Sequence, residues 1–247
     1  VNPRVLVLGA GYAGLSLARR LEGRLPDAAE LAVVDASPDH LVQHELHRLV
    51  RYPGLVDAIT VPLDETLDRA AVVTARVESV DREARRVHTD EGVLDYDVCA
   101  VCLGAETAFY GLPGVESHGT PLKRLADATE IRADFLAVAE RGEGRVVVGG
   151  GGLSGIQVAG ELAALAEEAG VSEGVEVVLL EQRDRVAPNF PERFSRAVGE
   201  ELQAQGVEVR TDEGVTAADE DTLTLGDGAT MPYDQFVWTG GIRGPGA

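Results

Sequence analysis

One eighteen-residue pattern occurs twice in the chain. Residues 4–21 (RVLVLGAGYAGLSLARRL) align without gaps on residues 145–162 (RVVVGGGGLSGIQVAGEL), and eight of the eighteen positions are identical. Each copy predicts a buried strand, a glycine-rich turn and a helix, which together open a βαβ nucleotide-binding unit. We therefore predict an α/β fold with two Rossmann-like dinucleotide-binding domains, each built on a central parallel sheet with a β-meander.

The glycines of each turn have separate physical roles. In the first copy, Gly9 permits the tight turn after the strand, Gly11 lets the backbone approach a pyrophosphate, and Gly14 lets the helix lie close to the sheet. The glycines at the same positions of the second copy are Gly150, Gly152 and Gly155. The first helical residues beside the two turns are Tyr12, Ala13, Leu153 and Ser154. Free N–H groups at these helix N-termini attract phosphate, so both turns are predicted to bind a dinucleotide.

An acidic residue follows the second strand of each unit. Residues 31–35 form an apolar run ending in Asp35, followed by Ala36, and residues 175–181 end in Glu181. A carboxylate at this place accepts hydrogen bonds from ribose hydroxyls and repels a 2′-phosphate. Glu181 therefore favours NADH over NADPH, while the nearby Arg183 and Arg185 would soften that preference.

Two dinucleotide sites on one chain indicate a pair of redox cofactors. We expect a bound flavin dinucleotide in the first site and a visiting nicotinamide dinucleotide in the second, because the two cofactors can then exchange hydride directly. The protein's part is to bind, orient and exclude water, so no acid–base triad is required. A dinucleotide-binding module without turnover, such as a redox sensor, is the alternative from a different class.

The rest of the chain suggests where the two domains divide. Residues 72–103 alternate short β-rich runs with turns and predict a meander that returns to the parent sheet, and residues 111–114 (GLPG) have the composition of a linker. The predicted domains are an FAD-binding domain over residues 1–112, to which residues 236–247 return, and an inserted NAD-binding domain over residues 113–235. Within the second domain, residues 122–140 and 194–205 are expected to be helical.

The motifs resemble those of the two-dinucleotide flavoprotein reductases. Residues 96–104 and 233–241 are similar to that superfamily, and four stretches resemble type II NADH dehydrogenases: 39–43 (DHLVQ), 122–128 (LKRLADA), 181–191 (EQRDRVAPNFP) and 238–244 (WTGGIRG). The resemblance implies an enzyme that oxidises NADH through FAD and reduces a membrane quinone. Sulfide:quinone and ferredoxin-type reductases are the alternatives within the flavoproteins.

The resemblance also implies roles for individual residues. Gly9, Gly11, Gly14 and Asp35 would hold FAD with the adjoining Tyr12, Ala13 and Ala36, Val77 would contact adenine through its backbone, and Gly104 would lie along the flavin. Gly150, Gly152, Leu153, Ser154, Gly155 and Glu181 would hold NADH, with Gly240 and Gly241 near the nicotinamide. Gln157 and Gln43 are the candidate catalytic residues. Gln157 stands where the family usually has a glutamate at the nicotinamide–flavin interface, and Gln43 falls where the family places the chain close to the isoalloxazine.

The family extends beyond the position of Ala247 with a flavin-binding Gly-Asp segment and an amphipathic membrane-binding C-terminus. We expect peripheral membrane contact only through such a segment, a cytoplasmic location at the inner face of the membrane, and a homodimer as the candidate assembly. The apolar runs are too short to predict a spanning helix.

The net charge of the chain argues against nucleic acid as a partner. Asp and Glu number 42 against 22 Lys and Arg, a formal net charge of −20, and Lys123 is the only lysine. Such a surface repels nucleic acid. Many carboxylates with almost no lysine favour a protein that works in molar salt, where charges are screened over roughly 3 Å. An ordinary acidic protein from a GC-rich genome is the alternative.

Two further groups of residues, a pair of cysteines and a set of histidines, are candidates for a chemical role. Cys99 and Cys102 form a CxxC, but i,i+3 side chains of a strand point to opposite faces, so we expect structural thiols rather than a redox pair. His40, His44 and His47 would share one face if their segment were helical. We expect these histidines to serve packing or to lie on the surface, without a metal; a proton relay near a quinone and metal binding are the alternatives.

Overall fold

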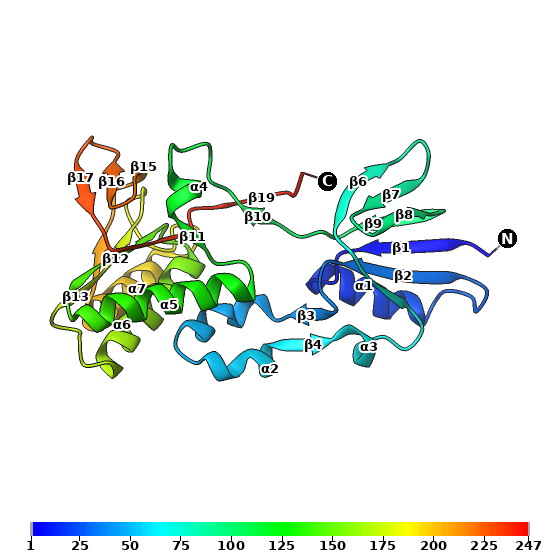
Figure 1. Cartoon of the computed structure of the whole chain (residues 1–247), viewed down its shortest axis with the longest axis horizontal. Coiled ribbons are helices and arrows are strands. Elements are labelled where there is room, and N and C mark those ends of the chain that lie inside the picture. The colour runs from blue at the N-terminus through cyan, green and yellow to red at the C-terminus, as the bar shows by residue number, and fades with distance from the viewer. Residues whose placement is uncertain (1, 247) are drawn as a thin grey trace. The chain divides into compact units, whose positions relative to one another are not determined.

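A computed structural model describes residues 2–246, which divide into two compact units (Figure 1). Unit 1 comprises Val1–Val42, Asp57–Glu106 and Arg243–Ala247. Unit 2 comprises Gln43–Val56 and Thr107–Ile242. Each copy of the repeated pattern therefore lies in its own unit.

Unit 1 is built on a four-stranded parallel sheet in the order β5-β2-β1-β9. These strands are β5 (Ala71–Thr74), β2 (Glu30–Asp35), β1 (Arg4–Leu8) and β9 (Val98–Val101), and helix α1 (Tyr12–Glu22) connects β1 to β2. Alternate residues of β1 serve two cores, as the period of a strand requires. Val5 and Val7 pack with Ala18 of α1, whereas Leu6 and Leu8 pack with Val87 of the meander.

The remaining elements of unit 1 are antiparallel or short. The meander consists of β6 (Val77–Asp81), β7 (Arg86–Thr89) and β8 (Gly92–Asp95). A second pair joins β3 (Asp39–Leu41) to β4 (Thr60–Pro62), which is followed by α3 (Leu63–Thr66). Strands β10 (Glu106–Thr107) and β19 (Ile242–Arg243) pair with each other where the chain passes between the units.

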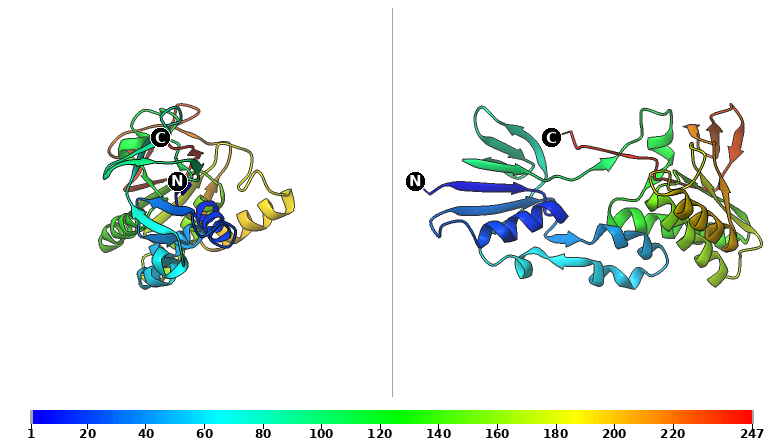
Figure 2. Two further views of the ribbon diagram at one scale, coloured as in Figure 1. Left: turned by 90° about the vertical axis from the view of Figure 1, so that its right-hand side faces the viewer. Right: turned by 180° about the vertical axis from the view of Figure 1, so that it is seen from behind.

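Unit 2 has a five-stranded parallel sheet in the order β11-β18-β12-β13-β14. The strands are β11 (Thr120–Pro121), β18 (Gln235–Trp238), β12 (Gly144–Gly149), β13 (Val175–Leu180) and β14 (Val207–Arg210). Helices α5 (Leu125–Arg141), α6 (Leu153–Glu168) and α7 (Glu192–Ala204) cover one face of the sheet (Figures 1 and 2). The other face carries α4 (Val115–His118) and the meander β15 (Val215–Ala218), β16 (Thr222–Leu225) and β17 (Thr230–Pro232).

A short segment from the first part of the chain packs on the helices of unit 2. The 3₁₀ helix η1 (Gln43–Val50) buries Leu46, Leu49 and Val50. Its end is held by Arg132 of α5, whose Nη1 donates to the carbonyl oxygens of Val50 at 2.7 Å and of Arg51 at 3.0 Å. The elements η2 (Pro53–Leu55) and α2 (Val56–Ile59) follow it.

The predicted fold class is confirmed, and the boundaries differ from the predicted ones in specific places. Strand β18 pairs with β12, Val146 lying opposite Gln235, so residues 236–242 belong to unit 2 and the return to unit 1 begins at Arg243. Residues 43–56 also belong to unit 2 because η1 buries its apolar side there. The meander predicted from residue 72 onward begins later, at Val77, because Ala71–Thr74 joins the parallel sheet instead.

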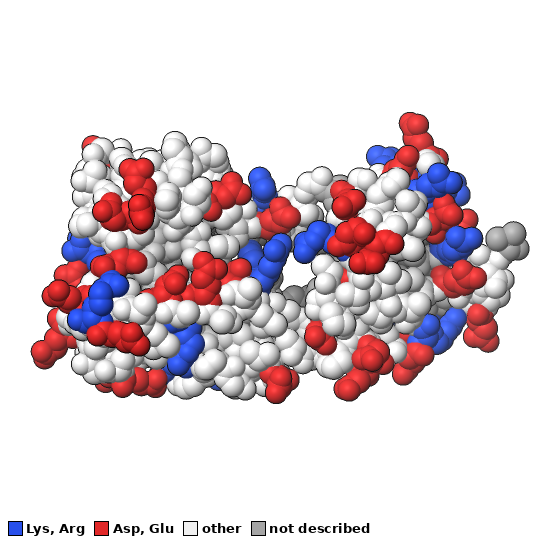
Figure 3. All heavy atoms as spheres, in the orientation of Figure 1, with Lys and Arg blue, Asp and Glu red and all other residues white. Residues whose placement is uncertain are grey.

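Carboxylates are spread over the face of each unit that Figure 3 displays, with arginines between them. Along residues 2–246, no helix has both the length and the apolar character needed to cross a membrane.

Candidate dinucleotide sites

The first glycine turn lies in unit 1 and is closed by backbone contacts. Gly9 has φ +93° and donates its N–H to the carbonyl oxygen of Val34 at 2.7 Å. A Cβ on Gly9 would overlap the carbonyl oxygen of Cys102, and a Cβ on Gly14 would overlap the carbonyl oxygen of Gly9. Both positions therefore require glycine for the strand–turn–helix packing itself.

The turn of unit 2 repeats this arrangement. Gly150 has φ +108° and donates its N–H to the carbonyl oxygen of Leu180 at 2.8 Å. A Cβ on Gly150 would lie 2.8 Å from Cα of Gly240. A Cβ on Gly155 would overlap the carbonyl oxygen of Gly150 and lie 2.7 Å from Oγ1 of Thr239. The repeat in sequence is therefore a repeat in three dimensions.

The middle glycine of each turn is not required by close packing, unlike the first and third glycines. Gly11 (φ −66°, ψ −172°) and Gly152 (φ −72°, ψ 179°) are extended, a conformation open to any residue. Around a Cβ placed on either, no heavy atom of residues 2–246 lies within 4 Å, the immediate chain neighbours aside. Both residues are N-caps, and within the described chain no side chain caps α1 or α6. Open space beside uncapped helical N–H groups fits a pyrophosphate.

The acid of unit 1 is joined to its own glycine turn. Asp35 Oδ2 accepts the N–H of Ala10 at 2.6 Å, and Oδ1 accepts the N–H of Ser37 at 2.9 Å. Each oxygen retains a lone pair, so the carboxylate is oriented by the backbone and can still accept a ribose hydroxyl.

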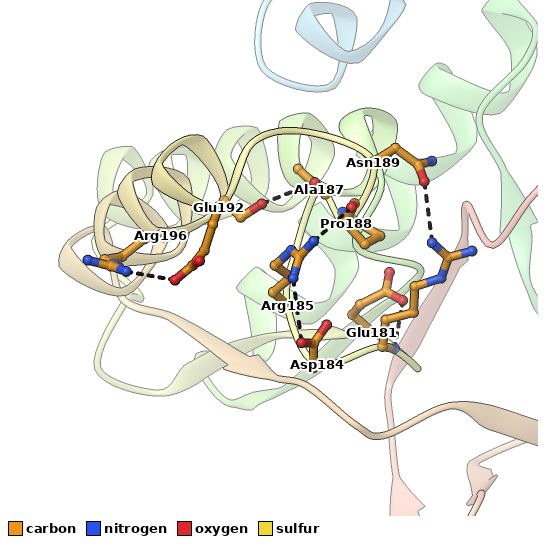
Figure 4. A network of polar contacts seen from close by, with 10 residues as sticks. Glu181, Asp184, Arg185, Ala187, Pro188, Asn189, Glu192 and Arg196 are labelled. Carbon is orange, nitrogen blue, oxygen red and sulfur yellow. Dashed lines mark hydrogen bonds and ion pairs between the residues drawn. The ribbon is translucent and has the colours of Figure 1, made fainter.

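The acid of unit 2, Glu181 (Figure 4), is also held by backbone N–H groups and is more deeply buried than Asp35. Glu181, which is 6% exposed, accepts the N–H of Gly151 at Oε2 (2.8 Å) and the N–H of Arg183 at Oε1 (2.9 Å). Its burial beside Gly151 fixes the carboxylate at the rim of the glycine turn.

The two arginines after Glu181 are engaged within their own loop. Arg183 Nη1 donates to Oδ1 of Asn189 at 3.3 Å. Arg185 pairs with Asp184 at 3.5 Å and donates to the carbonyl oxygen of Pro188 at 3.3 Å (Figure 4). Neither guanidinium group is paired with Glu181, so its negative charge remains available to discriminate against a 2′-phosphate.

The other predicted cofactor residues are found around the two turns or at strand ends, and their roles remain predictions. Tyr12 and Ala13 open α1, and Leu153 and Ser154 open α6, all four being exposed. Ala36 is exposed after β2, and Val77 is half-buried at the start of β6. Gly104, which follows β9, is exposed with φ +74°.

Gly240 and Gly241 are packed closely by aromatic side chains. A Cβ on Gly240 would run into the indole of Trp238, and one on Gly241 would overlap the hydroxyl of Tyr110. Packing against the indole accounts for Gly240, whereas the exposed Tyr110 ring has room to move away from position 241. The place of both glycines near a nicotinamide stays a prediction.

The two candidate catalytic glutamines both lie in unit 2. Gln43 is exposed and donates from Nε2 to the carbonyl oxygen of Lys123 at 3.0 Å. Gln157 is exposed on α6 and lines a cavity of about 700 Å³ together with His47, Arg51 and residues of α7. These contacts assign no chemical role to either glutamine, and catalysis by them stays a prediction.

The cysteines have the arrangement expected of structural thiols. Cys99 packs in the core on the meander side of the unit 1 sheet, and Cys102 packs on the α1 side. Both are free, and burial raises the pKa of the Cys99 thiol, which makes it a poorer nucleophile.

The histidines do not share one helical face. His40 lies in strand β3, where Nδ1 is 2.7 Å from the carbonyl oxygen of Ala10, and only His44 and His47 lie in η1. The segment is not continuously helical because β3 pairs with β4. Among the described residues, no group of three or more His, Cys, Asp or Glu side chains is arranged to hold a metal ion.

Two features were missed by reasoning from sequence. The first is that Asp35 and Glu181 bind their own glycine turns, which only the folded geometry reveals. The second is a small cavity where Lys123 lies beside Ser154 and Thr239. Its signal in the sequence was that Lys123 is the only lysine.

Comparisons with known proteins agree with this geometry. Residues 3–245 match the family described as pyridine nucleotide-disulphide oxidoreductase. The chain is 29% identical over 261 residues to the type II NADH:quinone oxidoreductase of Staphylococcus epidermidis, a match covering 98% of this chain and 65% of that relative. The chain thus spans about two thirds of that relative's length.

Solved structures support the fold. The structure of NDH2 from Plasmodium falciparum in complex with NADH matches with a TM-score of 0.90 at 18% identity, covering 99% of this chain and 56% of that one. The sulfide:quinone oxidoreductase of Aquifex aeolicus matches with a TM-score of 0.84 at 19% identity, covering 98% and 59%. With nearly its whole length matched, the chain belongs to the pyridine nucleotide-disulphide oxidoreductase family.

Proposed function

We propose that unit 1 binds FAD, that unit 2 binds NADH, and that the protein passes electrons from NADH through the flavin to a quinone. The observation that carries this proposal is the duplicated turn, in which Gly11 and Gly152 leave open space at an uncapped helix N-terminus. The S. epidermidis relative, named as a type II NADH:quinone oxidoreductase, supports the choice of donor and acceptor.

In unit 1, the turn would hold the FAD pyrophosphate. The N–H groups at the start of α1, which no side chain caps, would donate to phosphate oxygens. Asp35, oriented by Ala10 and Ser37, would accept hydrogen bonds from the adenosine ribose. Val77 and Gly104 would contribute backbone contacts to the adenine and the flavin.

In unit 2, the turn would hold NADH in the same way. The N–H groups of Leu153 and Ser154 would face the pyrophosphate across Gly152, and Glu181 would accept the ribose hydroxyls. Because the Glu181 carboxylate is buried and fixed, a 2′-phosphate placed against it would suffer uncompensated charge repulsion. Unit 2 is therefore selective for NADH over NADPH.

When bound, FAD and NADH would supply the redox chemistry, which belongs to the cofactors rather than to side chains of this protein. The residues of this chain bind the two dinucleotides and fix their orientation. Gln43, through its bond to Lys123, would hold the loop before α5, and Gln157 would present a neutral hydrogen-bonding group on α6.

The test is anaerobic reduction of the flavin. The protein, purified in high salt and loaded with FAD, should lose the visible flavin absorbance when NADH is added and regain it on addition of a short-chain quinone. Binding of both dinucleotides without any loss of absorbance would contradict the enzyme proposal and favour a binding module. Loss of absorbance with sulfide but not with NADH would favour the sulfide:quinone alternative, for which the match to the A. aeolicus structure gives a fold precedent.

The proposal extends to where and how the protein acts. A quinone acceptor dissolves in lipid, so the reaction would take place at a membrane surface, on the cytoplasmic side where NADH is present. Flotation with liposomes tests this contact, and light scattering coupled to size-exclusion chromatography tests the expected homodimer.

A further inference from the structure

Lys123 is the one ammonium side chain in a sequence with 42 carboxylates. Among residues 2–246, no carboxylate lies within ion-pair distance of its Nζ, and burial is the one cause that shifts its pKa, lowering it. An ammonium group that is partly buried without a counter-ion is uncommon in so acidic a protein, because nearby carboxylates are plentiful. Its charge is therefore free to meet a negatively charged ligand.

The backbone of Lys123 is held independently of its side chain. Its N–H donates to Oδ2 of Asp127 at 2.6 Å, and its carbonyl oxygen accepts from Nε2 of Gln43 at 3.0 Å. The position is thus fixed at the start of α5, and exchange of the side chain leaves both bonds intact.

Lys123 borders a small cavity next to the second glycine turn. The cavity, of about 30 Å³, is also lined by Ser154, Thr239 and Gly241. Ser154 is the second residue of α6, and Oγ1 of Thr239 donates to the carbonyl oxygens of Gly149 at 3.1 Å and Gly150 at 2.9 Å. A space of this size accepts a single polar group of a ligand rather than a whole ligand.

The strand order shows which half of a dinucleotide would meet Lys123. In the order β18-β12-β13, the glycine turn follows the central strand β12. Glu181 follows β13 on one side, and Thr239 to Gly241 follow β18 on the other. A dinucleotide with its adenosine ribose at Glu181 therefore directs its nicotinamide half toward the side of Lys123.

We propose that the Lys123 ammonium binds the nicotinamide-side phosphate of NADH and so fixes that half of the dinucleotide. This inference rests on the proposed binding of NADH in unit 2. Lys123 is a binding and positioning residue, and among the described residues that line the cavity it is the one with a positive charge. The α6 N-terminus supplies only N–H dipoles.

The experiment is a ligand series measured by equilibrium binding on the full chain. NADH carries both phosphates and the nicotinamide, ADP-ribose carries both phosphates without the nicotinamide, and AMP carries the adenosine-side phosphate alone. Lys123→Gln should lower the affinities for NADH and for ADP-ribose by a similar factor of roughly 10- to 100-fold, which corresponds to one charge-assisted hydrogen bond. The affinity for AMP should not change. Lys123→Arg should restore most of the affinity.

Arg193→Gln is the matched control, since it removes one positive charge from an exposed position of α7 and should change no affinity. Because Lys123 is the only lysine, an amine-directed acylating reagent provides a second readout by mass spectrometry. ADP-ribose should protect Lys123 from acylation, and AMP should not.

The outcomes separate the two proposals. Unchanged NADH and ADP-ribose binding in Lys123→Gln, with the wild type binding normally, would overturn the role of Lys123 and leave NADH binding intact. If Lys123→Gln lost affinity for NADH but not for ADP-ribose, the phosphate contact would be overturned and the nicotinamide amide would be the group that Lys123 contacts. A wild-type chain that binds none of the three ligands would overturn both.

Discussion

The Oε2 atom of Glu181 accepts a hydrogen bond from the backbone N–H of Gly151 at 2.8 Å, across thirty residues of sequence. Asp35 makes the equivalent bond to Ala10 at 2.6 Å in unit 1. In both units, the acid that ends the second strand therefore also ties that strand to the glycine turn after the first. Under the proposed function, one side chain in each unit would both recognise the ligand and hold the shape of the turn.

Replacement of Glu181 by Ala should weaken NADH binding by roughly 10- to 100-fold for each ribose hydrogen bond lost. The N–H groups of Gly151 and Arg183 would also lose their acceptor. The preference for NADH over NADPH should narrow, since the repelling charge is gone. Fluorescence titration with both dinucleotides measures these changes.

Glu181→Gln is the informative companion variant. It keeps one oxygen acceptor for the turn but removes the charge, so it should relax the NADPH discrimination while lowering NADH affinity less than Ala does. If Glu181→Gln discriminated against NADPH as strongly as the wild type does, the charge of Glu181 would not be what sets the preference for NADH.

The third and middle glycines of the second turn should differ strongly in their tolerance of a methyl group. Gly155→Ala forces a Cβ into the carbonyl oxygen of Gly150 and should destabilise the protein by about 3 kcal/mol, the upper end for overpacking, because backbone cannot move aside easily. Gly152→Ala meets open space at extended dihedral angles, so the lower entropy of the unfolded chain offsets the weaker N-cap, and stability should change by less than about 1 kcal/mol. Denaturant unfolding compares the two, and equal losses would refute the assigned packing.

The net charge of −20 predicts that salt stabilises the fold. Raising KCl to molar levels screens repulsion between carboxylates, so the thermal midpoint should rise steadily. A non-ionic osmolyte at matched osmolality is the control and should raise it less. A midpoint that stays constant or falls with KCl would contradict adaptation to high salt.

Glu161→Gln should stabilise the protein at neutral pH. Burial raises the pKa of the Glu161 carboxyl, even though Arg51, with Nη1 at 3.9 Å, and Arg48 act in the opposite direction. Folding therefore disfavours the ionised form, a cost that is present above the folded-state pKa and vanishes below the ordinary value of 4.5. The gain in unfolding free energy should be seen at pH 7 and be lost near pH 4.

The exposed Glu167, on the same helix, provides the control for that measurement. Glu167→Gln removes the same charge without removing a buried carboxylate, so it should give a smaller change. A loss of stability at pH 7 in Glu161→Gln would show that the ion pair with Arg51 outweighs the burial of the carboxylate.

The repeated pattern made the core of each unit predictable. Glycines at fixed spacing after a strand fix where the strand ends and the helix begins, and the structure places both turns and both helices accordingly. The alternation of Val5 and Val7 with Leu6 and Leu8 is the ordinary period of a strand buried on both faces.

The parts that were not predictable depend on contacts between distant segments. The sequence of residues 43–50 does not reveal that Leu46 and Leu49 are buried in unit 2. An amphipathic pattern specifies an apolar face but not the element that covers it. The same holds for β18, whose pairing with β12 joins residues nearly ninety positions apart. The bonds of Asp35 and Glu181 to their turns likewise depend on side-chain direction, which no sequence period encodes.

The most direct measurement of the central claim is the binding stoichiometry of FAD and NADH to the wild type and to two variants, Gly11→Ala and Gly152→Ala. Each added methyl group fills the open space of one turn only. The wild type should bind one FAD and one NADH, Gly11→Ala should lose FAD affinity by about tenfold or more while keeping NADH, and Gly152→Ala should do the reverse. Two results would contradict two separate dinucleotide sites: one folded variant that loses both FAD and NADH, or two variants that both keep the wild-type affinities for FAD and NADH.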